Sequence, residues 1–295
     1  MRMDGEEESV NVVDARGGGG GGGGSIGGRG IGLGTIAIAL VGGWIFGINP
    51  LTILGMLSGG GGQSVQTAPA PAARTPDSAT EEPEVKFVRQ VLGSTEKVWT
   101  AVFQKSGKSY EVPKLLLFSG STPTGCGRGE AAMGPFYCPT DRRVYLDMSF
   151  FNVMSQRLGA PGQFAQAYVV AHEVGHHVQN LLGITDKVDA ARQRSSEVQA
   201  NAVSVRVELQ ADCFAGVWAK LSQAQQGWRL EQGDIETALN AASQIGDDNL
   251  QRKARGTVVP DSFTHGSSAQ RVGWFKRGFE SGSPDQCNTF QAQQL

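Results

Sequence analysis

The stretch His172-Glu173-Val174-Gly175-His176 constrains the fold of this chain more than any other. It lies within residues 161–182, whose apolar side chains recur at three- and four-residue spacing, so we expect a helix there. Residues four apart project from the same helix face, about one turn from each other. His172 and His176 can therefore bind one metal ion together.

Glu173 extends this pair into a pattern with chemical meaning. Two histidines four apart, with a glutamate after the first, form the His-Glu-x-x-His pattern of zinc peptidases, in which the histidines bind the metal and the glutamate acts as general base. A motif this short also arises by chance. Three of the four histidines in the chain lie in residues 172–177, however, and the flanking valines predict burial, where polar groups need partners. We therefore expect one zinc ion per chain.

The third ligand has to come from elsewhere in the chain. A catalytic zinc ion takes three protein ligands and leaves its fourth position to water. The best candidate is Glu208, in a second expected helix over about residues 195–222. Asp212 lies one turn further on the same face and can accept a hydrogen bond from a liganding histidine. The alternative for both carboxylates is a solvated helix face, but the apolar residues around them favour burial.

The composition of the chain argues against nucleic-acid binding, and its cysteines raise the question of disulfide formation. A formal net charge of −2 gives no sign of nucleic-acid binding. The 295 residues leave room for a sizeable core even though much of the glycine falls before residue 63. The four cysteines form no Cys-x-x-Cys pair. Outside the cytoplasm we expect two disulfides, Cys126–Cys138 and Cys213–Cys287, and four buried thiols are the alternative.

The part of the chain before residue 84 divides into three segments. Residues 1–30 are polar and then glycine-rich, and we expect them to be disordered. Residues 31–57 carry no charge and are long enough to span a bilayer. A signal peptide fits less well, because the stretch starts far from the N-terminus without a short basic region before it; a buried soluble helix is a further alternative. Residues 58–83 are expected to form a flexible linker.

The orientation of the expected span follows from the basic residues on its two sides. Arg2, Arg16 and Arg29 precede it, and none follows until Arg74. The positive-inside rule then places the N-terminus in the cytoplasm and residues 84–295 outside.

Residues 84–295 show the pattern of one folded domain. The expected elements are an amphipathic helix over 87–103, strands over 114–118, 134–138 and 143–148, a helix over 233–244, and a last helix that Ser267 caps and that ends near residue 279. The two later strands suggest a hairpin whose edge can pair with an extended peptide. The alternative is an ordinary core hairpin.

His265 is the only histidine outside residues 172–177. In a peptidase it can donate a hydrogen bond to the oxyanion of a tetrahedral intermediate. A structural or surface histidine is the alternative.

In these residues and motifs, the chain resembles the "putative neutral zinc metallopeptidase" family of membrane-anchored bacterial proteins. The resemblance covers nearly the whole length, and its main motifs lie in residues 126–139, 145–147, 172–177, 208–212 and 262–287. The Glu-x-x-x-Asp spacing of Glu208 and Asp212 is also similar to that of gluzincin peptidases. The resemblance implies a zinc endopeptidase with Glu208 as third ligand and His265 near the active site.

These observations predict an α+β fold: a mostly helical, zincin-like metallopeptidase domain with a small antiparallel sheet, preceded by one transmembrane helix. We expect a single-pass protein of the bacterial cell membrane that hydrolyses peptide or protein substrates outside the cytoplasm. A catalytically silent zinc-binding scaffold or chaperone-like factor is the alternative, although such a site needs no general base. An interaction module without metal is a third possibility.

Overall fold

The computed structural model describes residues 1–3, 5–16, 82–225 and 227–295. The expected span, residues 31–57, and most of the expected linker lie outside these ranges. Within the described ranges, none of the helices combines the length and the apolar character that a bilayer crossing requires.

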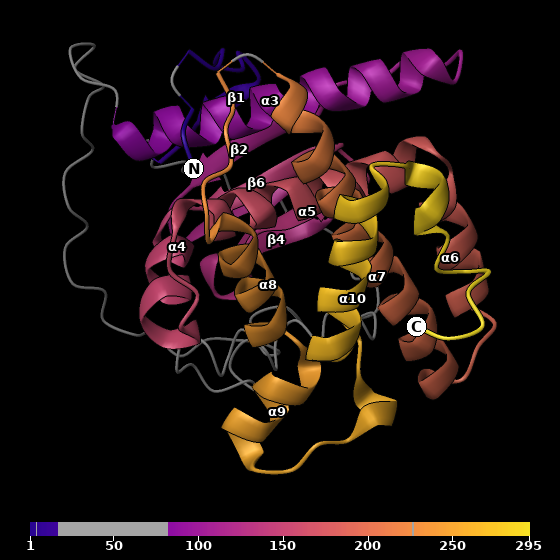
Figure 1. Ribbon diagram of the computed structural model, residues 1–295. Helices are drawn as coiled ribbons and strands as arrows, with labels where there is room; N and C mark the ends of the chain where they lie inside the picture. The colour runs from indigo at the N-terminus through magenta and orange to yellow at the C-terminus, as the bar shows by residue number, and fades with distance from the viewer. Residues whose placement is uncertain (4, 17–81, 226) are drawn as a thin grey trace.

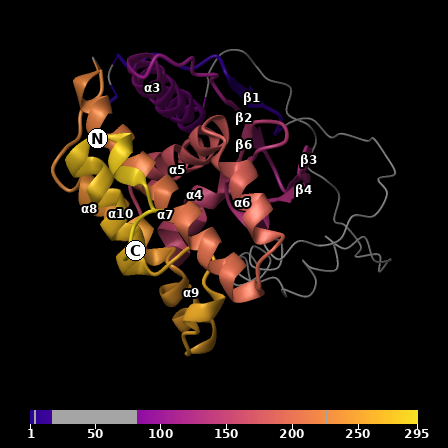
Figure 2. The ribbon, with the colours of Figure 1, turned by 90° about the vertical axis from the view of Figure 1, so that its right-hand side faces the viewer.

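The described part of the chain is mostly helical, with two small sheets (Figures 1 and 2). Its strands are β1 (Val12–Asp14), β2 (Lys114–Phe118), β3 (Ser121–Thr124), β4 (Gly127–Glu130), β5 (Phe136–Cys138) and β6 (Arg143–Asp147). Its α-helices are α3 (Pro83–Lys105), α4 (Ser149–Val153), α5 (Gln163–Leu181), α6 (Ile184–Arg192), α7 (Glu197–Leu221), α8 (Asp234–Gln244), α9 (Asp247–Arg255) and α10 (Ser268–Ser281). The α+β class is therefore confirmed.

The main sheet has the strand order β1-β2-β6-β5 and is mixed. Strand β2 runs parallel to both β1 and β6, and only β5 is antiparallel to its neighbour β6. The expected antiparallel pairing is confirmed for β5 and β6 and is wrong for β2 and β6. Between these two strands the chain passes through the separate β3–β4 hairpin and then β5, so β6 enters the sheet from the same end as β2. A parallel pair requires such a long crossover.

The N-terminal residues differ from the expectation of disorder over residues 1–30. Residues 12–14 form β1, which adds to the edge of β2 with Val12 opposite Leu115. Val12 is buried, and so is Glu6, which forms an ion pair with Lys97 at 2.8 Å. A polar composition argues against an independent core, but this segment orders on a sheet edge and a helix that the rest of the chain provides.

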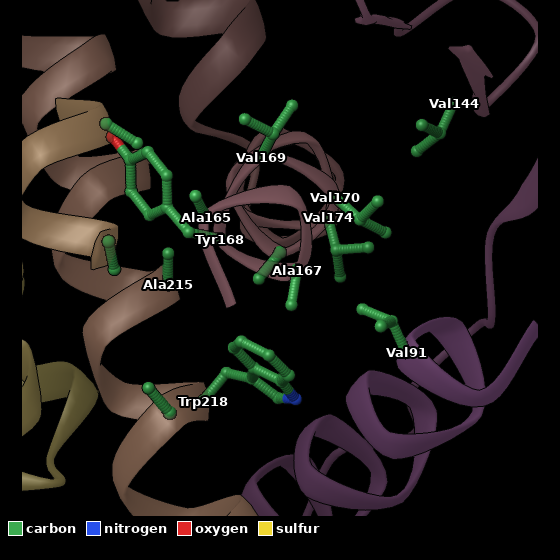
Figure 3. Close-up of a cluster of buried hydrophobic side chains, with 14 of the residues drawn as sticks. Val91, Val144, Ala165, Ala167, Tyr168, Val169, Val170, Val174, Ala215 and Trp218 are labelled. Carbon is green, nitrogen blue, oxygen red and sulfur yellow. The ribbon is translucent and has the colours of Figure 1, made fainter. Parts of the chain in front are cut away.

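Helix α5 runs through the centre of the hydrophobic core. Figure 3 shows it surrounded by Val91 of α3, Val144 of β6 and Trp218 of α7. The helix begins two residues after Pro161, because Gly162 has φ 112° and so cannot belong to a right-handed helix.

Glycines bring the helices that carry the site close together. A Cβ at Gly175 of α5 would lie 3.0 Å from the carbonyl oxygen of Ala211 in α7. A Cβ at Gly278 of α10 would lie 1.9 Å from the carbonyl oxygen of Cys213, also in α7. Helices α5, α7 and α10 therefore pack backbone against backbone (Figure 1).

Candidate metal centre

Three predicted side chains converge between α5 and α7. One ligand atom from each of His172, His176 and Glu208 lies within 4.8 Å of the others. The two Glu208 carboxylate oxygens lie 3.1 Å from Nε2 of His172 and 3.6 Å from Nε2 of His176. The imidazole rings are 4.8 Å apart and nearly perpendicular, at 89°. Glu208 thus faces both rings, which excludes the solvated helix face as an interpretation of this residue.

The outer nitrogen of each ring has its own acceptor. Nδ1 of His172 lies 2.9 Å from Asp212 Oδ1, and Nδ1 of His176 lies 2.9 Å from Gln179 Oε1. An Nδ1–H that donates to these oxygens leaves the lone pair of each Nε2 aimed at the carboxylate of Glu208. Two lone pairs and a carboxylate repel one another unless a cation lies between them. The donor set therefore fits a divalent metal ion with two nitrogen ligands and one oxygen ligand.

The pKa values in the cluster show the same preference for positive charge. Burial opposes a charge on His172, but Asp212 and Glu208 lie at opposite ring nitrogens and raise its pKa to about 10. Burial also opposes the charge on Glu208, yet His176 and His172 hold its pKa well below the ordinary value. The point where the three side chains meet thus attracts a cation, either a proton or a metal ion.

Asp212 is fully buried and forms hydrogen bonds in several directions. Besides His172, it accepts hydrogen bonds from Tyr168 Oη at 2.5 Å and from Arg271 Nε and Nη2 at 2.8 and 2.9 Å. Burial raises the pKa of the carboxyl, but Arg271 and His172 more than compensate and lower it to about 2. Asp212 is therefore an ionised acceptor that holds the His172 ring, as its spacing from Glu208 predicts.

Glu173 lies beside the ligands in a buried position, 7% exposed. Burial raises the pKa of this carboxyl, although His176 and His172 act in the opposite direction. A raised pKa suits a group that takes up a proton and releases it again near neutral pH.

His265 approaches the cluster from the segment before α10. Asp247, at the start of α9, positions this segment by accepting from the backbone N–H groups of Thr264, His265 and Gly266. Asp247 Oδ1 also lies 3.3 Å from Nδ1 of the His265 ring. Burial lowers the pKa of His265, while Asp247 and then Glu208 raise it. The next residue, Gly266, lies against α7, because a Cβ there would be 3.2 Å from Leu209, the neighbour of Glu208. His265 therefore belongs to the neighbourhood of the site.

Comparison with known proteins agrees with this geometry. The family model described as "Putative neutral zinc metallopeptidase" matches residues 1–290. The chain belongs to this family. No solved structure gives a significant match.

Relatives of this chain occur in Escherichia coli and in mycobacteria. The Escherichia coli (strain K12) protein "Uncharacterized protein YpfJ" is 50% identical over 297 residues, which cover 98% of this chain and 99% of the relative. The Mycobacterium bovis protein "Uncharacterized protein Mb2605" is 42% identical over 219 residues, 71% of this chain and 73% of the relative. The Mycobacterium tuberculosis (strain H37Rv) protein "Uncharacterized protein Rv2575" matches to the same extent.

Sequence reasoning missed the residues that support the site in this family member. Tyr168 and Gln179 lie four residues before His172 and three after His176, so helical spacing alone points to them. Arg271 and Asp247 carry no such signal, because their roles depend on where α9 and α10 pack.

His177 turns away from the cluster, as its position on the helix predicts. Its Nε2–H donates to the carbonyl oxygen of Glu111 at 2.6 Å, and Tyr137 Oη donates to its Nδ1 at 3.0 Å. Asn180 donates to the same Tyr137 oxygen at 2.9 Å. This set of hydrogen bonds joins strand β5 to helix α5.

Both expected disulfides are present. Cys126–Cys138 closes the loop that contains the β4 strand, and Cys213–Cys287 ties α7 to the segment after α10. Cys213 directly follows Asp212, so the second bond lies next to the support of the metal site.

Proposed function

We propose that this chain is a zinc-dependent endopeptidase that binds its metal through His172, His176 and Glu208. The observation that carries the proposal is the convergence of these three side chains with a buried glutamate, Glu173, in the next position along the helix. A purely structural zinc site usually has four protein ligands and needs no base. Family membership supports the same chemistry.

The protein residues have distinct roles in peptide hydrolysis. When bound there, zinc would supply a Lewis acid that lowers the pKa of a water molecule and polarises a peptide carbonyl. Glu173 takes a proton from the attacking water and delivers it to the leaving amine nitrogen. His265, charged through its contact with Asp247, donates from Nε2 to the oxyanion that develops on the carbonyl oxygen.

Strand β5 provides a place for an extended substrate. Within the described residues it is the last strand of its sheet, so its outer edge has no strand partner. The hydrogen bonds of Tyr137 hold this strand against α5, the helix that carries both histidines. A peptide that adds to this edge gains main-chain hydrogen bonds beside the helix of the two histidines. We therefore propose a peptide or protein substrate bound as an additional strand.

The cellular location belongs to the same proposal. The uncharged stretch 31–57 attaches the protein to the bacterial membrane, and the two disulfides favour an oxidising compartment outside the cytoplasm.

The test uses the purified full chain. We expect one zinc ion per chain by elemental analysis, cleavage of casein, and loss of cleavage with a chelator. Glu173→Gln should keep the zinc and lose at least 100-fold in cleavage rate, whereas the exposed control Glu280→Gln on α10 should cleave normally. Normal cleavage by Glu173→Gln would remove this residue from the mechanism. Zinc binding without cleavage by the wild type would favour the scaffold instead.

A further inference from the structure

Residues 5–16 form part of the same folded body as the metal site. Strand β1 pairs with β2 in parallel register. Hydrogen bonds to β2 continue at the residues just before and just after β1. The Leu115 N–H donates to the Asn11 carbonyl at 3.0 Å, and the Ala15 N–H donates to the Leu117 carbonyl at 2.9 Å. Strand β2 in turn pairs with β6, which packs on α5 (Figure 3).

The same segment covers helix α3 (Figure 1). The Glu6 side chain is fully buried and pairs with Lys97. Glu96 accepts from Ser9 Oγ at 2.7 Å and from Asn11 Nδ2 at 2.9 Å. At Gly93 a Cβ would lie only 2.6 Å from the carbonyl oxygen of Glu7, so the helix leaves space for this backbone. A buried carboxylate with an ion-pair partner and a close backbone contact describe a packed segment and not a loose tail.

Residues 16 and 82, which flank the long segment 17–81, lie next to each other. Arg16 Nη1 lies 2.8 Å from Glu82 Oε2, so the two ends of residues 17–81 are joined by an ion pair. The uncharged stretch 31–57 lies between them in sequence. A single crossing by that stretch would separate Arg16 from Glu82 by a hydrocarbon layer of about 30 Å. The ion pair and the β1–β2 pairing are incompatible with such a separation.

The basic residues behind the expected orientation also have other partners. Arg2 pairs with Glu231 at 2.8 Å, and Arg16 pairs with Asp14 at 2.7 Å as well as with Glu82. Two of the three arginines before the stretch therefore form ion pairs with the folded domain. These two arginines no longer support a cytoplasmic N-terminus.

We propose that residues 5–16 and the metal-site domain lie on one side of the membrane, and that the protein meets the lipid from that side only. The N-terminal segment is then a structural part of the domain. This topology replaces the single crossing with a cytoplasmic N-terminus that the charge pattern predicts. It stands independently of the catalytic proposal, since it rests on no residue of the metal site.

Cysteine labelling of the full chain in its membrane tests the topology. The four native cysteines are all in disulfides, so an introduced cysteine is the only free thiol. Val10→Cys and Val259→Cys place one in each part, at residues that are 90% and 45% exposed. With a membrane-impermeant maleimide, we expect both variants to label in the same preparation, either intact spheroplasts or inverted vesicles. Labelling of one variant in spheroplasts and of the other only in inverted vesicles would overturn the proposal.

A stability measurement tests the packing itself. Val12 and Val13 are neighbours in β1, but Val12 is 5% exposed and Val13 is 46% exposed. In the detergent-extracted full chain, Val12→Asp should lower the Tm of the domain by several degrees, and failure of this variant to fold would agree with the proposal. Val13→Asp should leave the Tm close to that of the wild type. Equal Tm values for Val12→Asp and the wild type would show that β1 is not part of the domain and would overturn the proposal.

Discussion

Arg271 of α10 donates from Nε to Oδ2 of Asp212 at 2.8 Å, and both side chains are buried. The other Asp212 oxygen accepts from His172. An ion pair thus connects a C-terminal helix, through one carboxylate, to a ring that is proposed to bind zinc. Partners of this kind orient metal ligands and raise their basicity.

Replacement of Asp212 tests that connection. Asp212→Asn should weaken zinc binding by about 10- to 100-fold, because the His172 ring loses its charged acceptor. Competition with a chromophoric chelator measures the change. Asp189→Asn, an exposed change on α6, should bind zinc like the wild type. Unchanged affinity in Asp212→Asn would mean that Asp212 serves only the fold.

The raised pKa of His172 predicts how stability depends on pH after the metal is removed. The folded-state pKa of about 10 exceeds the ordinary value of 6.5, so protonated His172 stabilises the fold fully below pH 6.5, and this contribution falls as pH rises towards 10. The Tm of chelator-treated protein should therefore drop between pH 6.5 and 9. Added zinc should raise the Tm more at pH 9 than at pH 6.5. The decrease of Tm with rising pH should be smaller in His172→Asn. A wild-type Tm that does not change with pH would contradict the raised pKa of His172.

Two glycines of α10 should respond in opposite directions to the same substitution. Gly278→Ala places a Cβ against the Cys213 carbonyl, so α7 and α10 must separate, at a cost of about 1–3 kcal/mol or more in the free energy of unfolding. Gly273 has nothing within 4 Å of its Cβ position. Gly273→Ala should therefore stabilise the helix by up to about 1 kcal/mol. Urea unfolding of the two variants measures the difference, and a similar effect for both would refute the close approach of the helices.

The hydroxyl of Tyr137 should matter for substrate binding. Tyr137→Phe leaves Nδ1 of His177 without a donor and loosens β5, at a cost of about 1–3 kcal/mol. If β5 binds the peptide, KM for a peptide substrate should rise several-fold while zinc content stays the same. Tyr145→Phe, in the neighbouring strand β6, removes a hydrogen bond to Asp141 and serves as the control. Equal KM values in the two variants would argue against β5 as the substrate strand.

The ligand set could be predicted from sequence because it follows helical spacing. His172 and His176 repeat at four residues, and so do Glu208 and Asp212. The apolar residues around each pair indicated which face is buried. His265 could be named but not placed, because its position depends on Asp247, which lies in a helix that the pattern did not reveal.

The sheet and the N-terminal segment show where sequence patterns were insufficient. Strand β2 was predicted with its observed bounds, since a run of leucines marks it. Its parallel pairing with β6 depends on the path of the chain between the two strands. β1 has three residues, and only Val12 is buried. Pairing with the edge of β2 orders β1, and the amino-acid composition of the segment cannot predict that pairing.

The bond between Cys213 and Cys287 joins positions 74 residues apart, and the helices α8, α9 and α10 lie between them. Within that covalent ring the segment from Gly256 to Ser262 is largely exposed. A single cut there by a protease would leave His265 and Arg271 attached to the helix of Glu208. Proteolysis at this exposed segment would therefore produce a nicked protein with all its parts still linked, and reduction of the disulfide would be needed to release them.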